Sequence, residues 1–382
     1  MIYEYPKFRD DLVISEVKQA GQIYFVIKDP ITNKFFRFKQ REYFIARQLD
    51  GQTPLEEIRQ RFFLEFKVNL PSAGLHQFVQ RLQGLGFTER GLTGRELSQL
   101  QRKMSVDQGR FQRLLSIKLK TVDPDSFLDA VLPRIRFLFT QPFVLLVVAL
   151  TIVAIAVVIS DWRDYYSYAP RLFRAGIIPT LLIVTFVMAS LHELAHGLTC
   201  KYFGGHVQEM GFLVLYFMPG FYCGVSDAWL FNDKSKRMWV SFAGMFFQMF
   251  VGALAAIAWR LIGHGTLLGD VCYISMAVSA LTILFNLNPL IKLDGYYLLS
   301  DYLDVPNLRR VAFAYLLSRI WGRRYSNLGG RAEIPRREKL IYVSYSMLAG
   351  VFSVGLVVLF FWKVIGLILS HSRAGAFLFY RR

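Results

Sequence analysis

Cysteine is scarce in this chain of 382 residues, and its placement excludes two common uses of the residue. The three cysteines, Cys200, Cys223 and Cys272, lie in apolar segments, and none belongs to a CxxC pair. We therefore expect neither a disulfide framework nor a cysteine-based zinc site. The sequence starts MIYEYPKFRDDLV and lacks a basic stretch followed by an apolar core. We expect no cleaved signal peptide and a cytoplasmic N-terminal segment.

Charged residues are also few, at 19% of the sequence, and acidic residues are the scarcer kind, with 28 against 45 basic ones. Hydrophobic residues make up 54%, which favours several membrane spans over one soluble core. The net charge of +17 would suggest nucleic acid for a soluble protein. In a membrane protein, basic residues collect in cytoplasmic loops, so the expected partner of this charge is the lipid bilayer.

Five runs of residues are long and apolar enough to cross a bilayer. They are residues 137–160, 177–200, 238–259, 271–291 and 340–362.

A sixth apolar run, residues 210–226, is short and contains Gly211, Pro219 and Gly220. If this run crossed the membrane, the basic residues that follow it would lie outside the cell, against the positive-inside rule. We predict that it is re-entrant and forms a hairpin that turns at Pro219–Gly220, because its aromatic residues favour strands. A kinked spanning helix is the alternative.

Residues 1–90 have the composition of a small soluble domain. QIYFVIKDP and TNKFFRFKQ predict a β-hairpin, and LDGQTPLEEIRQRFFLEF and PSAGLHQFVQRLQGLGF each predict a helix. Hairpin and helices in this order indicate an α+β, winged-helix-like module. Lys34, Arg37 and Lys39 on one strand raise DNA binding as an alternative, but three such charges are more often a solvated face.

The N-terminal segment resembles the PqqD-like domain, the peptide-recognition module of systems that modify ribosomally made peptides. The hairpin, the LDGQTPLEEI turn into a helix and the closing FVQRLQGLGFTE carry this resemblance over residues 8–90. It implies a cytoplasmic peptide-binding domain, with a peptide-modification or secretion system as a candidate partner.

The predicted fold is a polytopic α-helical membrane protein of about five spans plus a re-entrant β-hairpin-like segment, with the small α+β domain at the N-terminus. The predicted domains are the peptide-binding module at 1–90, a basic juxtamembrane connector at 91–136, the membrane core at 137–371 and a tail at 372–382. A bacterial inner membrane with the N-terminus in the cytoplasm is the expected location.

The second apolar run contains HELAH, which places His192, Glu193 and His196 in a predicted span. Histidines at i and i+4 lie on one face of a helix, so both imidazoles can reach one zinc ion. Glu193 can act as general base towards a zinc-bound water. Each ionisable group in a span costs about 2.5–3.5 kcal/mol, and a pair of hydrogen-bonded core histidines would leave Glu193 unexplained.

A catalytic zinc site usually has three protein ligands, and the stretch FNLNPLIKLDGYY supplies a candidate. Asn286 and Asn288 fall near the cytoplasmic end of the fourth run, and Pro289 ends its helix. Asp294 follows, at a similar membrane depth to the two histidines. A helix-capping role is the alternative for Asp294.

HELAH within a span, followed about a hundred residues later by NLNPLIKLDG, resembles the site-2 protease family of intramembrane zinc metalloproteases. The second motif of that family typically reads N-x-x-P-x-x-x-L-D-G. The resemblance implies one zinc ion per chain with His192, His196 and Asp294 as ligands and Glu193 as catalytic base. It also implies that Asn286 positions substrate or stabilises an oxyanion.

Further residues are candidates for substrate binding on weaker grounds: Asn288, Lys292, Gly211, Pro219, Gly220 and Asp227. The chain departs from the family pattern at Met245 and Gln248, where many relatives have Pro and Asn, and at Ile291 and Lys292.

The expected function is an intramembrane zinc metalloendopeptidase that cleaves a membrane-embedded or membrane-adjacent peptide near the cytoplasmic face. The alternative is a peptide-binding or export accessory protein that keeps zinc without proteolysis. A metal or ion transporter is less consistent with the sequence. The His pair and the Asp motif occur once each, without the internal repeat that is common in transporters.

Overall fold

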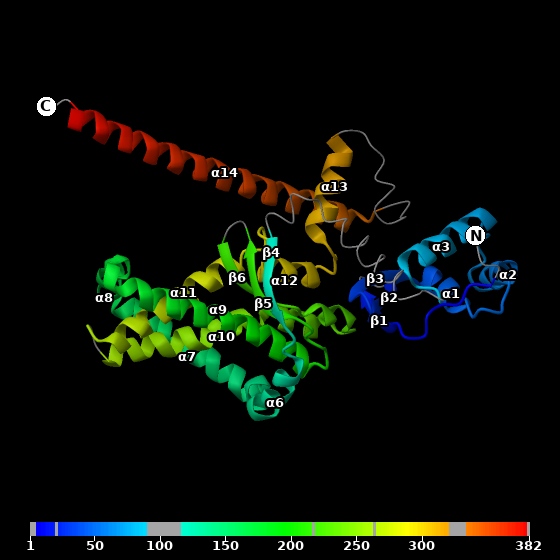
Figure 1. The fold of residues 1–382 in the computed structure, drawn as a ribbon, viewed down its shortest axis with the longest axis horizontal. Coiled ribbons are helices and arrows are strands. Elements are labelled where there is room, and N and C mark those ends of the chain that lie inside the picture. Colours follow the sequence, from blue (N-terminus) through cyan, green and yellow to red (C-terminus); the bar gives the residue numbers. More distant parts are fainter. Residues whose placement is uncertain are drawn as a thin grey trace. The chain divides into compact units, whose positions relative to one another are not determined.

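The computed structural model describes residues 5–19, 22–89, 116–215, 218–262, 265–320 and 334–379. The chain divides into two compact units, Met1–Thr282 and Ile283–Arg382. Figure 1 follows the elements from the N-terminal strands and helices in blue to the long C-terminal helix in red.

The N-terminal module, residues 5–89, is a three-stranded antiparallel sheet with three helices. The strands are β1 (Val13–Gln19), β2 (Gln22–Asp29) and β3 (Lys34–Lys39), with β2 in the centre. The helices are α1 (Gln40–Arg47), α2 (Leu55–Phe66) and α3 (Ser72–Leu85). The predicted hairpin is β2–β3 and the predicted helices are α2 and α3, so the small sheet with helices is confirmed. Strand β1 was missed because, of its apolar side chains, Val17 is buried while Val13 and Ile14 are exposed.

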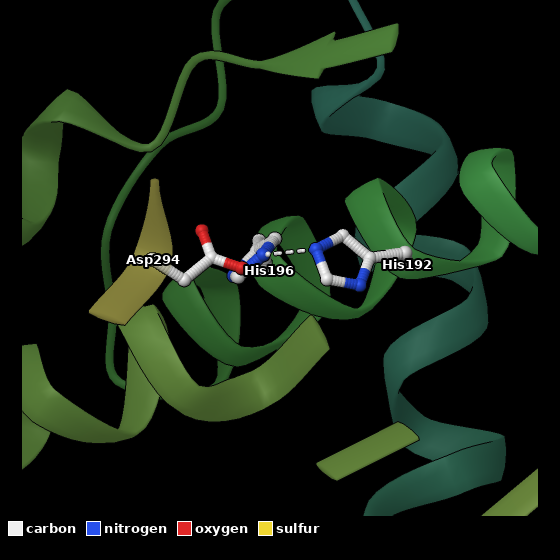
Figure 2. A group of neighbouring side chains, drawn as sticks. All are labelled: His192, His196 and Asp294. Atoms are coloured by element: carbon white, nitrogen blue, oxygen red, sulfur yellow. Dashed lines mark hydrogen bonds between the residues drawn. The ribbon is translucent and has the colours of Figure 1, made fainter. Parts of the chain in front are cut away.

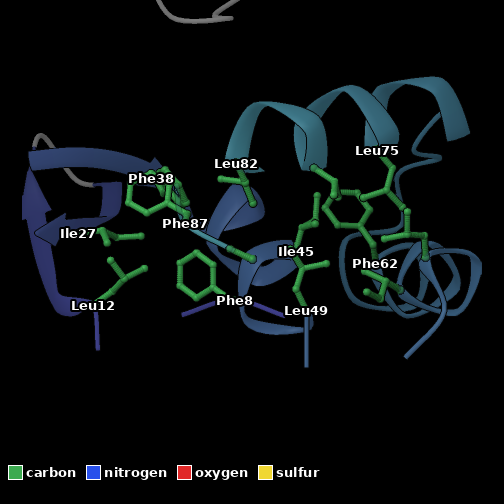
Figure 3. Packing of buried hydrophobic residues seen from close by; sticks show 14 residues of the cluster. Phe8, Leu12, Ile27, Phe38, Ile45, Leu49, Phe62, Leu75, Leu82 and Phe87 are labelled. Atoms are coloured by element: carbon green, nitrogen blue, oxygen red, sulfur yellow. The ribbon is translucent and has the colours of Figure 1, made fainter. Parts of the chain in front are cut away.

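One apolar cluster joins the sheet of this module to its helices (Figure 3). Phe87, which follows α3, is fully buried, and its ring packs edge-on against Phe36 and Phe38 of β3 at 4.6 and 5.8 Å between centroids. Fully burying a large apolar side chain contributes roughly 1.5–3 kcal/mol. Burial of this cluster is therefore the main contribution to the folding stability of this small module.

Five helices are long and apolar enough to cross a membrane, which indicates an integral membrane protein. They are α7 (Gln141–Ser160), α9 (Ile178–Tyr202), α10 (Lys234–Ile262), α11 (Leu267–Asn286) and α14 (Arg336–Phe379). Each of them overlaps one of the five predicted runs. Many of their large apolar side chains are exposed, as expected of surfaces that face lipid.

Helix α10 packs against both α7 and α9 (Figure 1). Ala154 of α7 is buried with Ala253 and Ala256 of α10. Small side chains at such a contact let two helices approach closely, which is how helices associate in a bilayer. The close packing holds α10 against α7.

Between α7 and α9 lie the short segments α8 (Trp162–Tyr168), η2 (Ala169–Phe173) and η3 (Ala175–Ile177). Tyr165 and Tyr168 of α8 pack on Trp259 and Tyr273, from the ends of α10 and α11. The hydroxyl of Tyr165 donates to the carbonyl of Ala256 at 2.8 Å. This aromatic cluster ties three helices together at the end of the core remote from the basic N-terminus of α10.

A second sheet consists of β4 (Ser116–Val122), β5 (Met210–Leu215) and β6 (Met218–Cys223), in that order and antiparallel. The stretch 210–226 is thus a hairpin, and the alternative of a kinked helix is wrong. Pro219 pairs with Val214 and Gly220 pairs with Leu213, so the prediction of a turn at Pro219–Gly220 is also wrong. Both residues lie within β6, an edge strand, where a proline without an N–H is tolerated.

Strand β4 comes from the predicted juxtamembrane connector, and nothing in the residues of that stretch indicates that it joins this sheet. Residues 91–115 of the connector lie outside the described residues. After β4 the chain forms α6 (Asp125–Ile135) and the 3-10 turn η1 (Arg136–Phe139).

Asp125, at the start of α6, fixes that helix to the end of α9. It accepts hydrogen bonds from the backbone N–H of Val207 at 2.8 Å and from Nζ of Lys201 at 3.0 Å. Burial alone would raise the pKa of Asp125, but these bonds outweigh burial and lower the pKa to about 2. The anchor is therefore complete above the unfolded-state pKa of about 3.9 and is lost as the pH falls through about 2.

The unit Ile283–Arg382 contains the end of α11 together with α12 (Asp294–Tyr302), α13 (Leu308–Ile320) and α14. Helix α13 packs on α14, with Leu308 and Ala312 fully buried, and Tyr296 of α12 belongs to the same cluster. This packing holds α12, whose first residue is Asp294.

We expect Phe87→Ala to destabilise the N-terminal module by about 3–5 kcal/mol, because it leaves a cavity between the sheet and the helices. Hydrogen exchange of the amides in β2 and β3, followed by mass spectrometry on the full chain, should show the loss. Phe63→Ala is the matched control, since Phe63 lies on α2 with half of its surface exposed. Equal exchange in the two variants would contradict the assignment of Phe87 to the core.

Candidate metal centre

Helix α9 carries the two histidines. Pro179 lies in its first turn, where its missing N–H costs nothing, and the chain turns away after Tyr202 at Gly204, whose φ is 89°. His192 and His196 are one turn apart and almost fully buried, at 6% and 5% exposed. Their Nε2 atoms are 3.1 Å apart, so the two imidazoles converge on one point.

His196 is oriented by α10. Its Nδ1 lies 2.7 Å from the carbonyl oxygen of Val240, and since a carbonyl can only accept, Nδ1 carries the proton. The lone pair is then on Nε2, the atom that faces His192. Metal-binding histidines are usually fixed in this way, with the second ring nitrogen donating to a carbonyl or carboxylate.

His192 packs directly on Gly244 of α10. A Cβ atom at position 244 would lie 2.4–2.6 Å from three atoms of the His192 ring. Any side chain at 244 would therefore turn the His192 ring away from its present direction. The surrounding AGMFFQ stretch departs from the family pattern at two other positions, and its sequence predicts no role for this glycine.

Asp294 completes the group. His192, His196 and Asp294 each offer one ligand atom, and these atoms all lie within 4.8 Å of one another. Figure 2 shows the Asp294 carboxylate and the two rings turned towards one another. The three residues predicted as ligands are thus brought together.

The donor set fits a zinc ion. Two imidazole nitrogens and one carboxylate oxygen form a set found in catalytic zinc sites, where water or substrate takes the fourth position. Zinc–nitrogen bonds of 2.0–2.1 Å in tetrahedral geometry place two nitrogen ligands about 3.3 Å apart. The separation of 3.1 Å between the Nε2 atoms is close to that value.

The loop before Asp294 is held by contacts within its own unit. Arg309 donates to the carbonyl of Leu290 at 3.2 Å, and the hydroxyl of Tyr345 donates to the carbonyl of Pro289 at 3.2 Å. Gly295 is required, because a Cβ there would lie 2.4 Å from the carbonyl oxygen of Asn286. These contacts fix the start of α12 and hence the backbone of Asp294.

The remaining predicted residues differ in what surrounds them. Glu193 is half-buried, directly after His192 on α9, and Asn286 is half-buried at the end of α11. The side chain of Asn288 accepts the N–H of Leu290 at 2.9 Å, so it shapes the loop. Lys292 is exposed.

The other candidate residues lie on the second sheet or directly after it. Gly211 lies in β5, and Pro219 and Gly220 lie in β6. Asp227 lies on the short helix that follows β6, and its carboxylate forms a buried ion pair with Lys28. An acidic residue just after an apolar run gives no sequence signal of such a distant partner.

Gln248 is a polar residue of this region that sequence reasoning left without a role. It is fully buried on α10, one turn after Gly244, and its Nε2 donates to the carbonyl of Met188 at 3.2 Å. Met188 precedes His192 by one turn of α9. Gln248 thus adds a second polar contact between α10 and the part of α9 that carries the first ligand.

Strand β6 packs against α9. The ring of Phe186 on α9 lies 4.7 Å from that of Phe221 on β6, and a Cβ at Gly197 would lie 3.1 Å from Sγ of Cys223. Because β6 is the last strand of its sheet, one edge of it pairs with no other strand in the described part of the chain.

Comparison with known proteins gives a distant similarity. A stretch of 132 residues, 34% of this chain, is 26% identical to the proposed peptide zinc metalloprotease YydH of Bacillus subtilis (strain 168). The stretch covers 50% of YydH, so the chain spans about half the length of the curated relative that it matches. No protein-family profile matches the chain, and no solved structure matches it.

We expect Gly244→Ala to weaken zinc binding by about 10–100-fold, because the added methyl group displaces the His192 ring. Competition with a chromophoric chelator on detergent-purified protein measures the affinity. Gly355→Ala is the control, since a Cβ there meets no atom within 4 Å. Unchanged affinity in Gly244→Ala would show that His192 does not bind the metal in this orientation.

Proposed function

We propose that this protein is an intramembrane zinc metalloendopeptidase. The observation that carries the proposal is the convergence of His192, His196 and Asp294 from two segments about a hundred residues apart, with Glu193 beside the first ligand. The distant similarity to a protein described as a peptide zinc metalloprotease supports it. So do the five helices that are long and apolar enough to cross a membrane.

The proposed chemistry is hydrolysis of a peptide bond. His192, His196 and Asp294 would hold a zinc ion, which would supply the Lewis acidity that polarises a peptide carbonyl. Glu193 takes the proton of the attacking water and passes it to the leaving amine. Asn286 is proposed to orient the substrate or to donate to the developing oxyanion.

The substrate is proposed to be a membrane-embedded or membrane-adjacent peptide, cut near the cytoplasmic face. The backbone of a helical substrate is bonded internally, so it has to unwind before its carbonyl can react. The free edge of β6 offers a place where an unwound segment can pair as an added strand. The hairpin would then be a re-entrant segment, which a bilayer tolerates when protein covers it or water fills the space around it.

The N-terminal module is proposed to recognise the peptide, as its resemblance to the PqqD-like domain implies. The proposed partner of the protein is a peptide-modification or secretion system. Nucleic acid is not proposed as a partner. The proposed location is a bacterial inner membrane with the module in the cytoplasm, in keeping with the basic residues at the start of α10.

Glu193→Gln tests the catalytic role. We expect this variant to keep about one zinc ion per chain and to lose cleavage by a factor of about 10²–10⁴, since general acid–base catalysis contributes that much. Mass spectrometry of peptide N-termini in membranes from cells expressing either form reveals the cleavage products, whatever the substrate is. Asp294→Ala should lose zinc, whereas Asp164→Ala, at an exposed carboxylate, should retain it.

Two outcomes would contradict the proposal. If every N-terminus of the wild-type membranes persisted with Glu193→Gln while zinc stayed bound, the site would not be proteolytic. The peptide-binding or export role would then be the better account. If Asp294→Ala kept its full zinc content, the assignment of the third ligand would be wrong.

A further inference from the structure

A buried ion pair connects the N-terminal module to the core. Nζ of Lys28 lies 2.6 Å from Oδ1 of Asp227, and the two side chains are 8% and 6% exposed. Lys28 belongs to the central strand β2, and Asp227 to the short helix η4 (Ser226–Leu230) that follows β6. Removing two charges from water is costly, and the cost is recovered only with good geometry, so such a pair selects one arrangement of its two segments.

The second oxygen of Asp227 holds the loop after α9. Oδ2 accepts the backbone N–H of His206 at 3.2 Å. Gly205 packs so closely here that a Cβ would lie 2.7 Å from Sγ of Cys200 and 3.3 Å from Cβ of Asp227. One carboxylate therefore links the module to the loop that ends the histidine-bearing helix.

Further hydrogen bonds reach the same stretch, residues 226–232, which we call the joint segment. From the module, Oγ of Ser15 donates to the carbonyl of Leu230 at 2.6 Å, and the N–H of Lys18 donates to Oδ1 of Asn232 at 3.3 Å. From α10, the guanidinium of Arg237 donates to the carbonyl of Phe231 at 2.8 Å. The joint segment is thus bonded from the module and from the core.

We propose that the joint segment docks the N-terminal module onto the metal-bearing core, with Lys28 and Asp227 as the positioning pair that fixes strand β6 beside α9. The joint segment starts just after β6 ends at Cys223, so a displacement of the module is transmitted to that strand.

The consequence of this docking for catalysis rests on the proposed function. A peptide held by the docked module is presented to β6 in a fixed arrangement. The substrate would then be a peptide with two separate parts, a recognition segment for the module and a scissile segment that reaches β6. A free peptide that fits only the metal site would be processed poorly.

The test is a cycle of two substitutions in the full-length protein in detergent. Lys28→Met leaves the buried carboxylate of Asp227 without its cation, which is strongly unfavourable. Lys28→Met combined with Asp227→Asn removes both charges and keeps an oxygen that can accept the N–H of His206. Lys18→Met is the control, because the side chain of Lys18 is exposed.

Hydrogen exchange of peptides covering residues 218–232 is the readout. We expect exchange to be at least tenfold faster in Lys28→Met, since opening this region becomes easier, and to return to within about twofold of wild type in the double variant. Lys18→Met should match wild type.

Three results would overturn the proposal. They are unchanged exchange at 218–232 in Lys28→Met, faster exchange confined to the strands of the module, and no recovery in the double variant. Zinc content and cleavage are recorded separately. If no proteolysis were found, the exchange result would still support the docking of the module. If Lys28→Met showed a normal exchange pattern, the zinc site would be unaffected by that result.

Discussion

Ionisable side chains in an apolar helix have to find partners, because a charged one costs about 2.5–3.5 kcal/mol at the centre of a bilayer. The contact between α9 and α10 meets this requirement for the two histidines. Val240 offers a carbonyl to His196, and Gly244 leaves room for the ring of His192. The close approach of α10 to α9 at Gly244 follows from the same need, since a carbonyl can serve His196 only if two backbones approach closely. The metal centre thus depends on how tightly two helices pack.

Two polar contacts outside that centre lie at the C-terminal end of α9. Asp125 holds α6 to the residues that follow α9, and Asp227 holds the N-terminal module to the neighbouring loop. Strand β6 lies in contact with α9. Under the proposed function, recognition, unwinding and hydrolysis of a peptide would take place on segments that are fixed to one helix, which would limit cleavage to peptides that are already held.

Part of this arrangement could be predicted from the sequence. A long uncharged run is expected to cross a bilayer as a helix, so the five spans followed from composition alone. The i, i+4 spacing placed both histidines on one face of a helix. Asp294 could be named as a third ligand because its motif resembles that of a known family. The contacts of Gly244, Val240 and Lys28 could not be predicted, since each depends on a partner brought close by tertiary packing. Strand β4 escaped because its alternating residues Ile117, Lys118, Leu119 and Lys120 were interpreted as part of a basic, amphipathic connector. The turn between β5 and β6 was misplaced because Pro–Gly is usually a turn signal.

X-ray absorption spectroscopy at the zinc edge, on detergent-purified wild-type protein, tests the central claim most directly. We expect about one zinc ion per chain, with a first shell of nitrogen and oxygen at about 2.0–2.2 Å and the outer-shell pattern of two imidazoles. A sulfur contribution at about 2.3 Å, as Cys200 or Cys223 would give, or a first shell without imidazole, would contradict this expectation.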